Sequence, residues 1–338
     1  MQTSTQPRIQ YSQATPEVAI VPLFKQETRT PDPQRLPFIE ANTKEVTLEH
    51  LTSDCIIPVF SKDNEITISH QTFIDTVMEA AKDVFPFEDI TAPAIRVSHI
   101  VKGRIPEAIH KPVSQLLESD KTIYYERMMF CFEIPTIFQD IDGSRLHLTI
   151  GGVRAYNEQN LYSKKSPEKF KIFIGFKNMV CCNLCISTDG YQSCLRVMEA
   201  SALRDSAIQL FRDYNMMQHL QLMSAFKELS LNETQFAQFL GKARLYQYLP
   251  TSQKKQLPEF LLTDTQIGLV AKSYYDDEHF GAGGEKDISL WKVFNLFTGS
   301  NKTSYIDNFL DRANNATQVT TGIARALQGD AEYSWFLR

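Results

Sequence analysis

The sequence predicts an α+β fold, with a half rich in antiparallel β-strands followed by a helical C-terminal half. Between residues 93 and 188, four segments rich in β-branched and aromatic residues are separated by polar or glycine-containing turns. Their links are too short for helical crossovers, except around 105–119, so the strands should pair antiparallel. From about residue 190 to the end, apolar residues recur at helical spacing.

We expect three regions in the 338 residues. Residues 1–45 hold six prolines and no glycine, which predicts an extended proline-rich arm. Residues 46–190 should form an α+β domain with the antiparallel sheet. Residues 191–338 should form a helical region packed on it.

The front of the second region combines short strands and one helix. CIIPVF (55–60) and EITIS (65–69) are predicted as strands joined by a polar turn. Ser69 is the expected N-cap of a helix that continues to about Phe85. The four longer strands follow in IRVSHIVKGRI (95–105), TIYYERMMFCFEI (122–134), RLHLTIGGVRAY (145–156) and KFKIFIGFKNMVCCNLCI (169–186), with a turn at Asp142-Gly143 between the second and the third.

The longest amphipathic segment of the helical half is 200–229. Asn232 with Gln235 and Thr263 with Gln266 have the spacing of capping boxes. Further helices are expected at 288–297, 304–313 and 316–327, the last ending at Gly329.

Composition restricts the classes of protein. The chain is 43% hydrophobic and 22% charged, as in globular proteins. It holds no uncharged apolar run of roughly 18 residues that would span a membrane, and its N-terminus lacks the pattern of a secretory signal. We therefore expect a cytoplasmic protein whose six cysteines are reduced.

Four of these cysteines, Cys181, Cys182, Cys185 and Cys194, fall within fourteen residues. A structural zinc site needs thiolates that converge from tight turns, and no glycine, proline or second CxxC pair supplies one here. The favoured interpretation is a buried strand, because free cysteine is among the most buried residue types. Zinc and redox chemistry remain the weaker alternatives, and we expect no metal and no cofactor.

Three other motifs match known functional sites only in part. GAGGEK (281–286) lacks the glycine spacing of a phosphate-binding loop. The preceding acidic DDEHF (276–280) is expected to be a solvated loop rather than a cation site. LSLNETQFAQFLGKARLYQYLP (229–250) resembles the start of a helix-turn-helix, but Pro250 interrupts the expected recognition helix. We expect ordinary helical packing there.

Residues 91–180 are the net-basic part of a chain of net charge −5, with 13 Lys and Arg against 9 Asp and Glu. Cations that follow a phosphate backbone, interleaved with aromatic rings for base stacking, are typical of single-strand binding. The alternative is that lysines protect an exposed strand edge while the aromatic side chains fill the core. The candidate contact residues are Arg96, Lys102, Arg104, Arg127, Arg154, Lys164, Lys165, Lys169, Lys171, Lys177, Tyr156 and Tyr162.

Catalytic motifs are missing from the sequence. The seven histidines are scattered and form no HExxH, and no GxSxG is present. We therefore predict no catalytic residue, although the sequence leaves an enzymatic activity open.

Five strings together resemble a known family: SHIVKGRIPEA (98–108), YYERMMF (124–130), LTIGGVRAYNEQNLY (148–162), FIGFKNMVCCNLCISTDGY (173–191) and YIDNFLDRANNA (305–316). They are similar to a domain-of-unknown-function family of Bacteroidetes chromosomes and their mobile elements, itself distantly similar to "phage/plasmid-like" proteins. The resemblance implies a cytoplasmic protein of phages, plasmids or conjugative elements. It implies no site residue.

Three hypotheses of function follow. The first is a non-enzymatic accessory protein of a mobile element that binds nucleic acid, in particular single-stranded DNA, through the basic region. The second is a protein-binding module or an inhibitor of a host system, without affinity for nucleic acid. The third is a metal-dependent enzyme. The expected partners are single-stranded nucleic acid, a protein partner or a second copy of the chain in a homo-oligomer. None of the three hypotheses involves a membrane.

Overall fold

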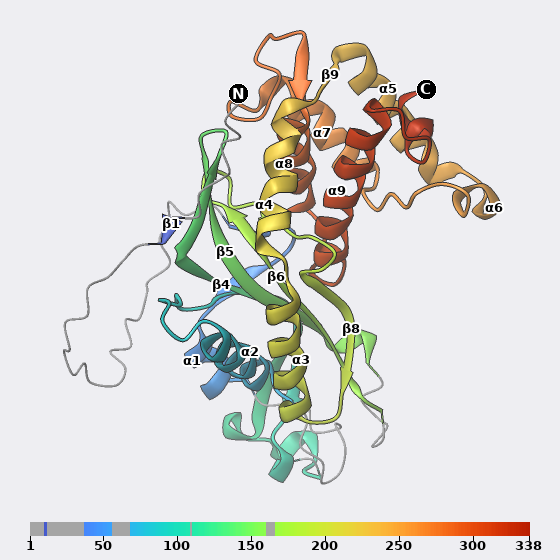
Figure 1. Cartoon of the computed structure of the whole chain (residues 1–338). Helices are drawn as coiled ribbons and strands as arrows, with labels where there is room; N and C mark the ends of the chain where they lie inside the picture. Colours follow the sequence, from blue (N-terminus) through green and yellow to red (C-terminus); the bar gives the residue numbers. More distant parts are fainter. Residues whose placement is uncertain (1–9, 12–36, 56–67, 109, 160–165) are drawn as a thin grey trace.

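The computed structural model describes residues 10–11, 37–55, 68–108, 110–159 and 166–338. Their main feature is a strongly curved, half-barrel sheet of antiparallel strands (Figure 1). Its strands are β1 (Gln10–Tyr11), β2 (Lys44–Val46), β3 (Ala94–Arg104), β4 (Lys121–Ile141), β5 (Ser144–Ala155), β6 (Glu168–Asn178), β7 (Leu184–Cys185) and β8 (Tyr191–Val197).

Consecutive strands are neighbours in the sheet, in the order β2-β3-β4-β5-β6-β7. The β4–β5 hairpin turns at Asp142-Gly143, where both residues have positive φ (48° and 74°), as a two-residue turn of the right twist requires. The outer edge of β6 is shared between two short strands, because β7 pairs with its C-terminal end and β8 with its N-terminal half.

Helices α2 (His70–Val84) and α3 (Ala200–Asp213) pack together against one face of the sheet (Figure 1). Ser69 caps α2 through its side chain, and Phe73 points from α2 between the rings of Phe130 and Phe170. Alternate residues of β4, such as Met128 and Phe130, face this side, because successive strand side chains point to opposite faces.

The N-terminal half of α9 (Ile306–Leu327) covers the opposite face. Ile306, Phe309 and Leu310 pack there on Met129 and Cys131 of β4. The rest of the helical half contains the buried helix α8 (Leu290–Asn301) and lies above the sheet in Figure 1. It comprises α4 (Met216–Ala225), α5 (Glu233–Tyr248), α6 (Thr251–Lys254), α7 (Asp264–Asp276) and the small pair β9 (Ser230–Asn232) and β10 (Asp287–Ser289).

The predicted fold class is confirmed, as are the Ser69 cap and both capping boxes. Helix α5 runs without interruption through the segment that resembled a helix-turn-helix, so ordinary helical packing is confirmed there. Among the described residues, no helix is long and apolar enough to cross a membrane. The predicted arm 1–45 and the strands in 55–69 fall mostly outside the described residues.

Several boundaries were wrong. Residues 191–197 are strand β8 rather than the start of the helical region. The segment 200–229 is divided by Tyr214 and Asn215, and Asn215 caps α4. The two helices expected at 304–313 and 316–327 are the single helix α9. This helix ends at Leu327, and Gly329, which follows two residues later, has a φ of 103°.

The cysteine-rich segment is only partly a strand. Strand β6 ends at Asn178, and a tight turn follows in which Cys182 has a φ of 58° and its amide donates to the Asn178 carbonyl. Cys185 lies in β7 and is buried, whereas Cys194 on β8 is exposed. Within the described part of the chain, no group of His, Cys, Asp and Glu side chains could hold a metal ion.

Candidate nucleic-acid interface

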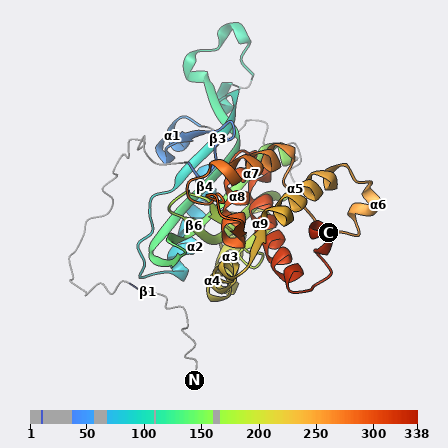
Figure 2. The same cartoon turned by 90° about the horizontal axis from the view of Figure 1, so that it is seen from above.

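Strands β3 and β4 extend beyond the rest of the sheet as a two-stranded ribbon. From here on, residues 100–121 are called the arm; they are distinct from the proline-rich segment predicted at 1–45. Strand β5 pairs with β4 only from Arg127 onward, so among the described residues the ribbon's one further strand contact is the isolated bridge of Cys55 with Ile123. Its tip contains three short 3-10 helices, η1 (Pro106–Ala108), η2 (Val113–Gln115) and η3 (Glu118–Asp120). Figure 2 shows the arm projecting away from the body. His99, with a φ of 58°, interrupts the β-ladder at its root.

The surface of the arm mixes cations and apolar groups. Lys102 is exposed, and Lys111 and Lys121 pair with Asp120 and Glu118 while keeping about half of their side-chain surface accessible (41% and 51%). Three apolar side chains are also exposed on the arm: Ile100 (49%), Val113 (76%) and Leu117 (63%). Arg104 is half-buried and donates to the Lys111 carbonyl, which fixes the tip on the ribbon.

Two cations of the predicted set, Arg154 and Lys177, lie in the interior of the protein. Arg154 pairs with Glu168 on the α2 face of the sheet, between the rings of Tyr156 and Phe170. Lys177 donates to Glu133 (2.8 Å), whose other oxygen lies 3.0 Å from His147 Nδ1. Burial with a carboxylate partner removes both from the predicted interface, because neither charge reaches the surface.

Two further cations attach helix α9 to the sheet. Lys171 of β6 donates to the carboxylate of Asp311 at 2.8 Å, and Tyr191 of β8 donates to the other oxygen at 2.7 Å. Arg127 of β4 lies 3.4 Å from the Asp307 carboxylate. These ion pairs are partly buried, so the expected phosphate contacts of Arg127 and Lys171 would require them to open.

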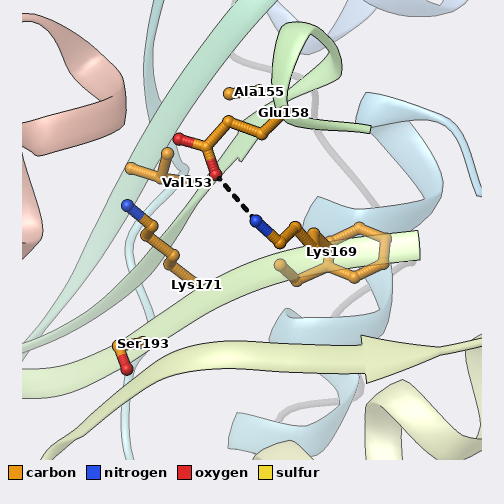
Figure 3. A pocket seen from close by; sticks show the side chains of 7 residues that line it. Val153, Ala155, Glu158, Lys169, Lys171 and Ser193 are labelled. Atoms are coloured by element: carbon orange, nitrogen blue, oxygen red, sulfur yellow. Dashed lines mark ion pairs between the residues drawn. The ribbon is translucent and has the colours of Figure 1, made fainter. Parts of the chain in front are cut away.

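The remaining residues of the set are dispersed. Arg96 donates to the side chain and carbonyl of Thr43, and Lys169 lies 3.6 Å from Glu158 across a small pocket (Figure 3). Tyr156 is buried against Tyr124 and His70, so it offers no face for base stacking. Lys164, Lys165 and Tyr162 lie outside the described residues.

A polar groove of about 500 Å³ that the sequence interpretation missed lies between β8 and α9. Side chains of α9 form one wall, among them Asp311, Asn314 and Gln318, which share one helix face by their spacing. Ser193 of β8 lines both this groove and the small pocket of Figure 3, where it lies below Lys171. The sequence signal that could have indicated this groove is the run of Asn and Gln side chains in ANNATQ (313–318).

A family description, "Domain of unknown function, B. Theta Gene description (DUF3871)", matches residues 22–337. The protein belongs to the DUF3871 family. The match covers the sheet except for β1, the arm and nearly all of the helical half, so this architecture is that of a DUF3871 chain. No curated protein and no solved structure matches the sequence.

For this DUF3871 protein, membership gives no reaction or ligand, and the candidate interface therefore depends on geometry alone. Of the twelve predicted residues, the arm contains Lys102 and Arg104. The structure adds Lys111 and Lys121, which the sequence interpretation had not included in the site.

Proposed function

We propose that this DUF3871 protein binds single-stranded nucleic acid with its projecting arm, as an accessory protein of a mobile element, phage or plasmid. The observation that carries the proposal is the arm itself, a projecting β-ribbon that presents the exposed side chain of Lys102 and the ion-paired, half-exposed side chains of Lys111 and Lys121 beside exposed apolar side chains. The mobile-element setting is supported by the sequence resemblance to phage/plasmid-like proteins.

The chemistry of the arm suits a phosphate backbone. Lys102 lies in the middle of the ribbon, Lys121 lies at its outer end opposite Arg104, and Lys111 lies in the tip. Such cations replace condensed counterions, so affinity should fall as salt is added. Ile100, Val113 and Leu117 add exposed apolar surface beside these cations.

A second candidate function is the capture of a protein partner by the same arm. The exposed Val113 and Leu117 at the tip favour it, because apolar side chains on a projecting loop are typical anchors of protein interfaces. The formal charge of the arm is only +1, from four Lys and Arg against three Asp and Glu, so its attraction for a phosphate backbone is modest, which also favours this alternative.

The two candidates differ in their response to salt and to charge reversal. Fluorescence anisotropy of a labelled oligo-dT is measured at low and at moderate salt for the wild type and for Lys102→Glu/Lys121→Glu. The matched control is Lys227→Glu/Lys272→Glu, which makes the same charge change on exposed lysines of the helical half.

The nucleic-acid proposal predicts salt-sensitive binding that the arm variant loses and the control keeps. Equal loss in both variants would assign the effect to net charge rather than to the arm. Absence of binding at low salt would reject nucleic acid as the ligand. A stoichiometric protein partner that is lost on Val113→Ser/Leu117→Ser would then support the second candidate.

A further inference from the structure

A cysteine, a histidine and an aspartate converge beside the root of the arm. His50 Nδ1 lies 2.7 Å from Asp54 Oδ2, and His50 Nε2 lies 3.8 Å from Cys55 Sγ. The Cys55 side chain is half-buried and His50 is partly exposed, so both are accessible from solvent. This is the order of groups in a nucleophile, base and orienting acid.

Local structure fixes this arrangement. The Thr47 hydroxyl caps the short helix α1 (Leu48–Ser53) by accepting from the His50 amide, and the Asp54 amide donates to the His50 carbonyl. His50 and Asp54 are four residues apart and therefore share one face of the turn. Cys55 follows directly and forms an isolated β-bridge with Ile123 of β4.

The hydrogen bonds define which histidine nitrogen has the free lone pair. An ionised carboxylate only accepts, so the 2.7 Å contact to Asp54 places the imidazole proton on Nδ1. Nε2 is then an acceptor, and the Tyr125 hydroxyl, 2.8 Å away, donates to it. The lone pair of Nε2 thus lies within reach of both the tyrosine hydroxyl and the Cys55 thiol.

We propose that Cys55 is a nucleophilic thiol that accepts acyl groups from ester or thioester donors, with His50 as its general base and Asp54 as a positioning residue. Sγ forms a bond to the carbonyl carbon while the bond to the alcohol or thiol leaving group breaks. The thiol proton passes to His50 Nε2 and then to the leaving group. No electrons are exchanged with an oxidant.

The charges around the thiol make base assistance necessary. Burial raises the pKa of Cys55 to about 11, and the Asp54 charge adds to the increase, while Lys44 of β2 opposes it. Tyr125 and Tyr156 face the same cluster from β4 and from η4 (Tyr156–Glu158). Free thiolate is therefore scarce at neutral pH, and rapid acylation of Cys55 requires proton transfer to His50.

The probe is p-nitrophenyl acetate, with acetylation of each cysteine followed by mass spectrometry of its peptide. Exposed Cys194 is the internal reference in the same molecule. At pH 7 we expect His50→Ala to lower the rate at Cys55 by about 10²-fold and to leave Cys194 unchanged. Tyr125→Phe should raise the Cys55 rate, because it removes the competing donor to Nε2.

The Asp54→Asn variant separates catalysis from a structural role. It should lower the His50-dependent rate at Cys55 in the neutral range, because the carboxylate that orients the imidazole through Nδ1 is lost. A Cys55 rate that His50→Ala leaves unchanged relative to Cys194 would overturn the proposal. If His50→Ala unfolds the chain, acetylation of the buried Cys185 will reveal it. The rates at Cys55 in Asp54→Asn and in Tyr125→Phe then test the proposal instead.

This site is independent of the proposed nucleic-acid contact. Cys55→Ala should bind oligo-dT as the wild type does, so the failure of one proposal leaves the other standing.

Discussion

The guanidinium of Arg154 and the carboxylate of Glu168 form an ion pair enclosed in the sheet, with 0% and 4% of their side-chain surface exposed. The second Glu168 oxygen accepts from the amide of Ile68, so the carboxylate also fixes the entry to α2. In the described structure, Nε and Nη1 of Arg154 lack a hydrogen-bond acceptor. The rings of Tyr156 and Phe170 cover the guanidinium instead.

Removing one partner of this pair should be more damaging than removing both. Glu168→Ala leaves an uncompensated buried cation and should lower the free energy of unfolding by roughly 3–5 kcal/mol. The double variant Arg154→Met/Glu168→Leu should recover a large part of the loss. Urea denaturation measures both, and Asp140→Ala, which breaks the exposed pair with Arg145, is the control with a far smaller effect. A double variant no more stable than Glu168→Ala would contradict this account.

Gly152 lies where Phe73 of α2 packs closely on the sheet. A Cβ there would lie 2.5 Å from Phe73 Cζ and 2.7 Å from the Lys171 carbonyl oxygen. We expect Gly152→Ala to lower the free energy of unfolding by about 1–3 kcal/mol through overpacking. Gly103→Ala on the arm is the matched strand control, because its nearest atom would be Thr122 Cγ2 at 3.6 Å. Equal melting temperatures for the two variants would show that α2 does not contact the sheet so closely.

Two buried histidines should make the protein sensitive to mild acid. Burial lowers the pKa of His219 to about 4 and that of His70 to about 3, where the nearby Arg154 charge contributes as well. Unfolded histidine titrates near pH 6.5, so the unfolded state binds protons first as the pH falls. Stability is therefore lost from about pH 6.5 down to pH 4, at up to about 1.4 kcal/mol per pH unit for each histidine.

Urea denaturation at pH 7, 6 and 5 measures this loss. His219→Gln should reduce the slope of stability against pH between pH 6 and 5, since glutamine does not titrate. Replacement of the exposed His110 by glutamine should leave the slope unchanged. A wild-type stability that is constant over this range would disprove the buried neutral state of His219.

Asn295 joins the buried helix α8 to the cysteine-rich turn. Its side-chain oxygen accepts from the side-chain Nδ2 of Asn178 at 3.0 Å, and its backbone carbonyl accepts from the Asn183 side chain. Asn295→Ala leaves the buried side-chain Nδ2 of Asn178 without this acceptor and should lower the free energy of unfolding by about 1–3 kcal/mol. Asn308→Ala, at an exposed position of α9, is the control. We expect Cys182 to react faster with a thiol reagent in Asn295→Ala, because the turn is no longer held by α8. An unchanged rate would contradict this role of Asn295.

Local signals in the sequence predicted the fold well. The Ser69 cap, the capping boxes and the Asp142-Gly143 turn depend on residues close together in the chain, and each was found where expected. Strand β8 was missed because Gln192, Ser193 and Cys194 have no alternating apolar pattern. Its partner β6, rather than its own composition, makes it a strand.

The candidate interface was harder to predict because charge alone does not reveal its partner. Arg154, Lys177 and Lys171 are basic in sequence, but their carboxylates come from Glu168, Glu133 and the distant helix α9. Likewise, no sequence spacing joins Tyr125 to His50. Only the fold brings together groups from separate elements, so the sequence identified the basic region without showing which cations remain exposed.

The position of α9 has a consequence for synthesis on the ribosome. Strands β3 to β6 pair with their neighbours in sequence and can form as soon as residue 178 has emerged. The sheet face containing Met129, Cys131 and Phe173 then remains exposed to water until residues 306–313 follow, well over a hundred residues later. At roughly 5–20 residues per second, the nascent chain would present this apolar face for several seconds or more. During that time, aggregation competes with folding, and a holding chaperone would have its greatest effect.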